Sequence, residues 1–171
     1  MKSAREHHLS IEALDIRHDR KIFSCGSVAL DRYLIRQASQ DTRKHVAATF
    51  VLVATDSPSV LGYYSLSATS IELRELPEGL IKKLPKYPLM PAILIARLAV
   101  DKTRHAKGYG QLLLIDALKR CLNTQDIGWV AVIVDAKDEH AVTFYEHHHF
   151  IRFSPNAPRL FLPRSTIASL F

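Results

Sequence analysis

The chain has few of the residues that mark several large classes of protein. Its 171 residues include two cysteines, Cys25 and Cys121, which lie far apart and match no metal-ligand spacing. This argues against a disulfide scaffold and against a zinc module, and it favours reduced core thiols in a cytoplasmic protein. No apolar run has the roughly 20 residues of a membrane-spanning helix, and the N-terminus with Glu6 and two histidines is unlike a signal peptide. Because repeats, low-complexity tracts and long linkers are also lacking, we expect one domain over residues 1–171 and no membrane contact.

The charge of the chain is unbalanced toward positive. Lys and Arg number 23 against 17 acidic residues, a formal net charge of +6. This excess favours a polyanionic partner such as nucleic acid, an acidic protein or a phosphorylated cofactor, although a solvated basic surface alone explains +6 more simply. We expect no metal site, because the consecutive histidines 147–149 cannot all face one point from a helix.

Hydrophobic periodicity and turn residues predict strands that first follow one another and then alternate with helices. We expect strands over residues 9–14, 47–55, 60–71, 92–100, 129–135, 151–153 and 159–162, and helices over residues 27–44, 78–84, 109–123 and 139–148. Ser27 can cap the first helix, and the turn at residues 56–59 joins a hairpin. The pattern predicts an α/β (α+β) fold with a mixed, mostly antiparallel central sheet and helices on both faces.

The most informative segment is residues 97–110. An apolar strand ends at Val100, and a basic loop that ends Gly108-Tyr109-Gly110 leads into the helix over residues 109–123. Glycine allows a ligand to approach the backbone closely, and free N–H groups at a helix N-terminus favour anions. The segment therefore predicts a site for the phosphates of a coenzyme, used in acyl transfer.

These residues resemble the GNAT superfamily of N-acetyltransferases. His105–Gly110 lies where that family carries a (Gln/Arg)-x-x-Gly-x-(Gly/Ala) loop, and Ala141–Glu146 is similar to its A-x-x-F-Y helix. Val132–Ala136 resembles the strand that separates from its neighbour to admit pantetheine. The resemblance implies the GNAT fold and acetyl-CoA as the acetyl donor.

A closer resemblance, over residues 13–167, is to the acetyltransferase toxins of bacterial type II toxin–antitoxin modules. The matching segments are Phe23–Gly26, Leu30–Leu34, Gly62–Ser67, Leu84–Pro88, Ala96–Asp101 and Arg159–Pro163. The resemblance implies acetylation of the α-amino group of aminoacyl-tRNA, which blocks translation. It also implies a ribbon-helix-helix antitoxin, operator DNA bound through that antitoxin, and a homodimer.

The resemblance implies the residues of the site as well. Tyr145 is the implied general acid, since a phenol with a pKa of about 10 can protonate a departing thiolate whose thiol has a pKa of about 8.5; an ordinary buried aromatic is the alternative. The residues assigned to acetyl-CoA are Leu98, Ala99, Val100, Arg104, His105, Ala106, Lys107, Gly108, Tyr109, Gly110 and Asp135. Strand residues 98–100 are expected to act through main-chain atoms, with one amide freed by a bulge to polarise the thioester.

Two positions depart from the family pattern. His105 replaces Gln or Arg, and a neutral imidazole offers one donor and no full charge, so Arg104 and Lys107 are expected to compensate. His149 stands before Phe150 where the family usually has glycine. A left-handed conformation at His149 would cost about 1 kcal/mol relative to glycine.

No carboxylate stands out as a general base. At pH 7 an α-amino group with a pKa of about 7.7–8.0 is roughly 10% neutral, whereas a lysine amine at about 10.4 is neutral at well under 0.1%. An enzyme without an evident base therefore suits an aminoacyl ester better than a protein lysine. Glu72, Glu75 or a chain of water molecules remain alternatives.

Basic side chains are expected to contact the tRNA acceptor stem. They are Arg32, Arg36, Arg43, Lys44, Lys82, Lys83 and Arg97. Arg97, in an otherwise apolar strand, either faces the substrate or antitoxin or pairs with an acid such as Asp31. Two other functions stay open: acetylation of a small amine or protein N-terminus, and a CoA- or antitoxin-binding module with little turnover that acts in operator repression.

Overall fold

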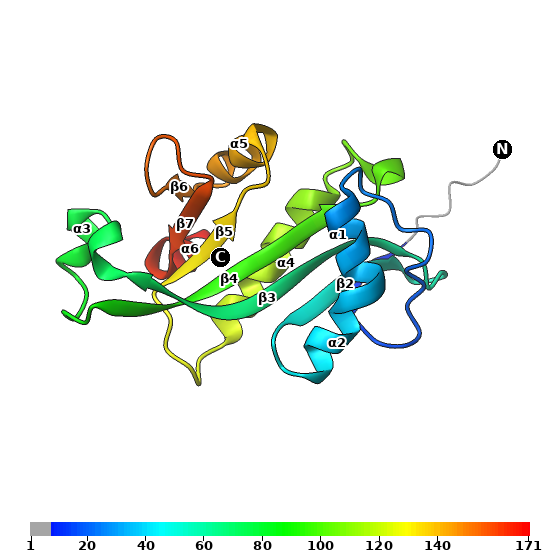
Figure 1. The fold of residues 1–171 in the computed structure, drawn as a ribbon, viewed down its shortest axis with the longest axis horizontal. Helices are drawn as coiled ribbons and strands as arrows, with labels where there is room; N and C mark the ends of the chain where they lie inside the picture. Colours follow the sequence, from blue (N-terminus) through cyan, green and yellow to red (C-terminus); the bar gives the residue numbers. More distant parts are fainter. Residues whose placement is uncertain (1–7) are drawn as a thin grey trace. The chain divides into compact units, whose positions relative to one another are not determined.

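The structure, a computed structural model, describes residues 8–171. Its strands are β1 (Leu9–Ala13), β2 (Ala48–Ala54), β3 (Val60–Glu72), β4 (Leu89–Val100), β5 (Ala131–Asp135), β6 (Ile151–Arg152) and β7 (Arg159–Pro163), and its α-helices are α1 (Val28–Arg32), α2 (Ala38–Arg43), α3 (Glu78–Ile81), α4 (Tyr109–Asn123), α5 (Glu139–His147) and α6 (Arg164–Leu170). The strands follow the order β1-β2-β3-β4-β5-β7-β6 in a seven-stranded sheet (Figure 1). None of the helices in residues 8–171 is long and apolar enough to span a bilayer.

The described residues fall into two compact units. The first contains the chain up to Leu66 together with Arg97–Ala117, and the second contains Ser67–Ala96 together with Leu118–Phe171. Strands β3 and β4 and helix α4 contribute residues to both units.

In the first unit, helices cover both faces of β3. Tyr63 and Tyr64 are neighbours on this strand, so their side chains point to opposite faces. The Tyr63 hydroxyl donates to the Leu30 carbonyl of α1 (2.6 Å), and the Tyr64 hydroxyl donates to the Asp116 carboxylate of α4 (2.5 Å). The prediction of helices on both faces is thus confirmed for this unit. The predicted hairpin is confirmed too, with Val51 opposite Tyr63 in antiparallel register.

Gly62 lets α4 approach β3 closely. A Cβ at this position would lie 2.9 Å from Leu113 Cδ1 and 3.0 Å from the Ala99 carbonyl oxygen. The leucine methyl can move aside, but the carbonyl belongs to a neighbouring strand. We therefore expect Gly62→Ala to lower the free energy of unfolding by about 1–3 kcal/mol, the usual cost of overpacking. Chemical denaturation measures this, with Gly128→Ala as the control, because a Cβ at Gly128 meets nothing within 4 Å.

The helix predicted over residues 27–44 is not continuous. Ser27 does cap it, since its hydroxyl accepts a hydrogen bond from the Leu30 N–H (3.4 Å). However, a π-helical turn at Tyr33–Gln37 separates α1 from α2, and the Ala38 N–H donates to the Tyr33 carbonyl five residues back. The wide turn buries Tyr33 and Ala38 together. The prediction of one regular helix was wrong. A π-helical turn contains one residue more than an α-helical turn, and the spacing of apolar residues in the sequence does not indicate this extra residue.

In the second unit, the strands pack against a separate apolar core. β4 and β5 are parallel, with Ile95 opposite Val134, and β7 runs antiparallel beside β5. The core residues are Ile71, Leu76, Met90, Ala92, Ala131, Ile133 and Phe161. Both cysteines of the chain, one in each unit, are buried and form no disulfide, as expected.

The sequence prediction was wrong at two places in this unit. Strand β4 begins at Leu89 and includes Pro91, where a loop was expected. Proline has no N–H to donate, but its carbonyl here accepts from the Val130 N–H (2.9 Å), so the residue still takes part in pairing. Helix α6 was not predicted at all. It follows Pro163, has no side-chain cap, and depends on the burial of Ile167.

Helix α5 ends in a Schellman motif. The Phe150 N–H donates to the Tyr145 carbonyl and the His149 N–H to the Glu146 carbonyl, both at 3.1 Å. His149 has a φ of 74°, the left-handed conformation that favours glycine. We expect His149→Gly to raise the free energy of unfolding by about 1 kcal/mol. A denaturant titration measures the change, and an unchanged or lower midpoint would contradict the strain argument.

Candidate functional site

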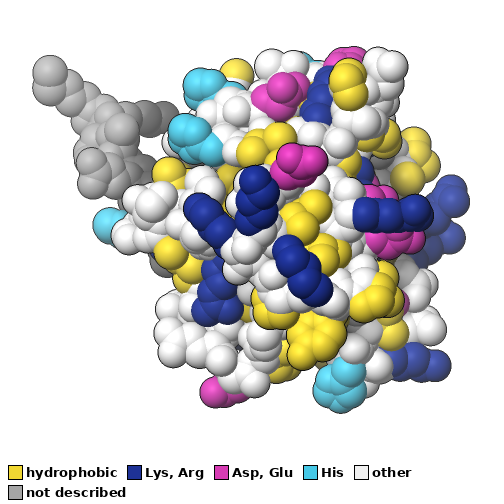
Figure 2. Space-filling view, turned by 90° about the vertical axis from the view of Figure 1, so that its left-hand side faces the viewer, with side chains coloured by type: hydrophobic (Ala, Val, Ile, Leu, Met, Phe, Trp, Pro, Cys, Tyr) yellow, Lys and Arg dark blue, Asp and Glu magenta, His cyan; other side chains and the backbone are white. Residues whose placement is uncertain are grey.

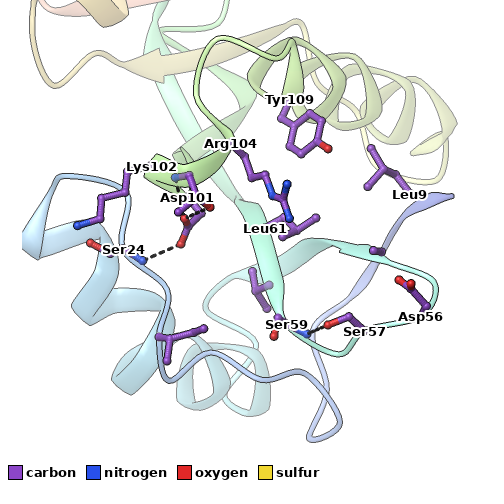
Figure 3. Close-up of a pocket in the computed structure, with 14 residues that line it drawn as sticks. Leu9, Ser24, Asp56, Ser57, Ser59, Leu61, Asp101, Lys102, Arg104 and Tyr109 are labelled. Atoms are coloured by element: carbon purple, nitrogen blue, oxygen red, sulfur yellow. Dashed lines mark hydrogen bonds between the residues drawn. The ribbon is translucent and has the colours of Figure 1, made fainter. Parts of the chain in front are cut away.

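The loop after β4 is anchored at its start by Asp101 (Figure 3). One carboxylate oxygen accepts from the Thr103 N–H (3.0 Å) and hydroxyl (2.7 Å), and the other accepts from the Ser24 N–H (3.1 Å). Burial raises the pKa of Asp101, but the hydrogen bonds from Thr103 and Ser24 outweigh this and hold the pKa below its ordinary value. The loop therefore leaves the strand in a fixed direction.

The backbone of the loop turns sharply before α4 begins. Ala106 has a φ of 58° and Gly108 a φ of 78°, both left-handed. Residues 105–108 are exposed, and α4 follows at Tyr109. The first N–H groups of a helix have no partner within it, and they carry partial positive charge. A left-handed loop at such an end presents main-chain donors to an anion, so this part of the site suits a diphosphate.

The His105 side chain is already engaged within the loop. Its Nε2 lies 2.8 Å from the Val100 carbonyl oxygen, so the ring closes the loop onto the end of β4. A ring held in this way braces the loop, which leaves the main-chain N–H groups and the two flanking cations, Arg104 and Lys107, for a phosphate.

Arg104 extends toward a cavity of about 460 Å³ in the first unit. Figure 3 shows its side chain near Tyr109 and Leu61. The Arg104 Nε is buried and has no hydrogen-bond partner among the described residues. Because an unpaired buried donor is costly, a ligand with an acceptor close to this nitrogen would be favoured.

Tyr145 occupies α5 in the second unit and is almost completely buried. Its ring packs against Phe150 (5.3 Å between centroids), the hydrophobic contact that accompanies a Schellman motif, and against Phe144 (5.2 Å). No hydrogen bond to its hydroxyl is found among residues 8–171. Burial raises the pKa of Tyr145 well above its ordinary value, so the phenol keeps its proton throughout the neutral range.

Asp135 lies at the end of β5 and is engaged through its side chain. Its carboxylate accepts from Arg159 Nε (2.9 Å) and Nη2 (3.3 Å), and the two residues are register partners on β5 and β7. The side chain of Asp135 is therefore held against Arg159, at the end of the strand.

Three of the predicted basic residues meet in one groove of the first unit. Arg32, Arg36 and Arg97 line it together with Tyr33. Arg97 does not pair with Asp31, whose carboxylate accepts from the Cys25 N–H (2.8 Å). Instead, the Arg97 guanidinium carbon lies 3.4 Å from the centre of the Tyr33 ring, an interaction that sequence reasoning missed.

The other predicted basic residues lie elsewhere. Arg43 and Lys44 are exposed at the end of α2, and Lys82 and Lys83 are exposed beside α3 in the second unit. Figure 2 shows a face of the molecule on which Lys and Arg side chains are interspersed with apolar ones.

Comparisons with known proteins show the family of the chain. The acetyltransferase (GNAT) domain model matches residues 85–159. The chain is 31% identical over 169 residues to a probable toxin TacT from Sinorhizobium fredii, covering 94% of this chain and 93% of that protein. It is 34% identical over 137 residues to a tRNA-acetylating toxin of Mycobacterium tuberculosis, covering 80% of each.

Solved structures of related toxins are also similar to this chain. AtaT in complex with acetyl-methionyl-tRNAfMet has a TM-score of 0.88 and 31% identity, covering 96% of this chain and 99% of that one. AtaTR bound with AcCoA has a TM-score of 0.82 at 31% identity, covering 95% and 98%. These matches confirm the predicted fold class.

Proposed function

The chain belongs to the acetyltransferase toxins of the GNAT superfamily, and from this membership we propose that it transfers acetyl from acetyl-CoA to the α-amino group of aminoacyl-tRNA. The observation that carries the proposal is the left-handed loop at the start of α4, which suits a diphosphate, on a chain similar over 80% of its length to a tRNA-acetylating toxin. Blocked α-amino groups stop peptide-bond formation, so the product would inhibit translation in the cytoplasm.

The residues present fit acetyl-CoA, which supplies the activated acetyl group. Main-chain N–H groups of residues 106–110 would hold the diphosphate, with Arg104 and Lys107 contributing charge. Main-chain atoms of Leu98, Ala99 and Val100 would hold the pantetheine arm and polarise the thioester carbonyl, and the Asp135 main chain would lie along the same arm.

Tyr145 is proposed as the general acid. Its hydroxyl donates a proton to the thiolate that departs when the amine displaces it. The raised pKa keeps the phenol protonated throughout the neutral range, so the acid form is present when the carbon–sulfur bond breaks. We assign no general base, since an aminoacyl ester amine is substantially neutral near pH 7.

The pH dependence of the reaction follows from these assignments. The amine must be neutral, so kcat/KM is expected to rise with unit slope and to level off at or below a pH of about 7.7–8.0. The phenol is active in its neutral form, which exists below its pKa; because burial raises that pKa, no falling limb is expected up to pH 9.5. Initial rates on freshly charged tRNA measure the profile, and a falling limb centred near pH 9 would contradict the assignment of Tyr145.

The cations Arg32, Arg36, Arg43, Lys44, Lys82, Lys83 and Arg97 are proposed to contact tRNA phosphates. Each such contact releases counterions, so KM for charged tRNA should rise steeply with salt.

We propose three further properties, of which the relatives support an antitoxin partner and a complex with DNA. A ribbon-helix-helix antitoxin would neutralise the enzyme, the antitoxin would carry the complex to operator DNA, and the enzyme would form a homodimer. A structure shows a mutant AtaT toxin bound to the C-terminus of the antitoxin AtaR, and a crystal structure shows a KacTA–DNA complex.

The test incubates the protein with labelled acetyl-CoA and a charged tRNA pool, beside the Tyr145→Phe variant. Label on aminoacyl-tRNA with wild type, and much less with the variant, is expected. Label on free amines or protein N-termini alone would favour a different acceptor. If wild type and Tyr145→Phe both bind CoA but neither transfers acetyl, the protein would be a binding module rather than an enzyme.

A further inference from the structure

The groove lined by Arg32, Arg36 and Arg97 is called here the three-arginine groove. Arg97 is the arginine of this groove that belongs to the sheet, and its side chain packs on the ring of Tyr33. Arg32 and Arg36 belong to α1 and the π-helical turn and are exposed, whereas Arg97 lies half-buried in β4. The guanidinium group of Arg97 lies over the face of the Tyr33 ring, with its Cζ atom 3.4 Å from the ring centre. Stacked arginines keep their N–H groups free at the edges, because the ring contacts only the face of the group.

Tyr33 is itself held in place. Its hydroxyl donates to Asp41 Oδ2 (2.9 Å), and Gln37 Nε2 donates to the other oxygen of the same carboxylate (2.9 Å). Hydrogen bonds from Gln37 and Tyr33, together with the positive charge of Arg97, lower the pKa of Asp41, so this carboxylate stays ionised. The ring of Tyr33 also stacks on Tyr63 of β3, 6.3 Å between centroids.

The π-helical turn explains how Asp41 reaches Tyr33. In a regular α-helix each residue advances by about 100°, so a residue eight positions on lies about 80° from the first. One inserted residue removes about 100° from this angle and leaves Asp41 within about 20° of Tyr33. Without the wide turn, the carboxylate would face a different direction and Tyr33 would lose its hydrogen bond.

The residues that line the groove include no carboxylate, although the charge of Asp41 acts on Arg97 from outside this lining. No ion pair to Arg32, Arg36 or Arg97 occurs in the part of the chain that the structure describes. The two nearby acids are engaged, Asp31 with the Cys25 N–H and Asp41 with Tyr33 and Gln37.

From this geometry we propose that Tyr33 and Asp41 are positioning residues, which hold Arg97 in the orientation that lets it bind a phosphate of the tRNA substrate alongside Arg32 and Arg36. The proposal rests on the proposed function for its substrate. It goes beyond that function by assigning a role to two residues that carry no positive charge.

The test separates the ring from the hydroxyl. Tyr33→Leu removes both, Tyr33→Phe keeps the ring, and Asp41→Asn weakens the anchor and also removes a negative charge near Arg97. We expect Tyr33→Leu to raise KM for charged tRNA about tenfold with kcat within about twofold of wild type, and Tyr33→Phe and Asp41→Asn to raise it about two- to threefold. The slope of log KM against log salt should fall by about one in Tyr33→Leu, because one phosphate contact is lost.

A merely structural role would give a different result. In that case KM would change without a change in salt slope, or the acetyl-CoA Kd and the melting temperature would change in parallel with KM. The double variant Tyr33→Leu/Arg97→Gln must bind tRNA no worse than Arg97→Gln alone, and additive losses would overturn the proposal. If Tyr33→Leu does not fold, Tyr33→Phe and Asp41→Asn decide the question by the same readouts.

Two controls complete the experiment. Tyr87→Leu, at an exposed tyrosine of the second unit, should leave KM and salt slope unchanged. Wild-type protein tests the proposed function in the same assay: if it does not acetylate charged tRNA, that function fails. If wild type is active and Tyr33→Leu is indistinguishable from it, only the positioning proposal fails.

Discussion

Replacement of Tyr145 by phenylalanine is expected to lower kcat for acetyl transfer about 100- to 1,000-fold, the range in which a positioned general acid acts. The change removes one oxygen atom and keeps the ring, so the contacts with Phe144 and Phe150 remain. Since no described residue hydrogen-bonds to this hydroxyl, its loss leaves no buried polar group unpaired, and the melting temperature should stay within about 2 °C of wild type.

Steady-state kinetics with charged tRNA and a thermal melt measure both effects. Tyr87→Phe is the matched control, because it removes the same atom from an exposed tyrosine. A kcat for Tyr145→Phe within threefold of wild type would show that the departing thiolate takes its proton from elsewhere. The acetyl-CoA Kd should not change in either variant, since the phenol is assigned to a step after binding.

Gly108→Val is expected to weaken acetyl-CoA binding at least about 30-fold. Gly108 has a φ of 78°, and a β-branched residue in this conformation is a severe outlier, so the loop would abandon the left-handed turn. The Cβ itself meets no neighbouring atom within 4 Å, so the effect comes from the backbone and from crowding of the ligand. Isothermal titration with acetyl-CoA measures it.

A matched control is available at Gly26. This glycine has a φ of 96°, and a Cβ there also meets nothing within 4 Å, but it precedes α1 and lies outside the loop. Gly26→Val should therefore destabilise the fold comparably and leave the acetyl-CoA Kd within about twofold of wild type. Equal losses of affinity in both variants would assign the effect to general instability.

The features that the sequence predicted correctly are those with local signals. The helix of α4, the hairpin of β2 and β3, the Ser27 cap and the turn into α4 each depend on side chains within a few residues of one another. The sequence also indicated what a left-handed residue before Phe150 would cost, because the end of α5 is a local motif. The family resemblance rests on the same kind of signal, which is why fold and chemistry could be predicted together.

The features that the sequence did not reveal depend on contacts between distant segments. Pro91 joins β4 because Val130, 39 positions later, donates to its carbonyl, and α6 forms because Ile167 is buried. The stack of Arg97 on Tyr33 joins a strand to a helix 64 positions earlier, and the π-helical turn that steadies Tyr33 has no periodicity of its own. Local propensity therefore determined most of the elements and the loop before α4, whereas tertiary packing decided the orientation of Arg97, since a side chain's direction depends on the neighbours that the fold brings to it.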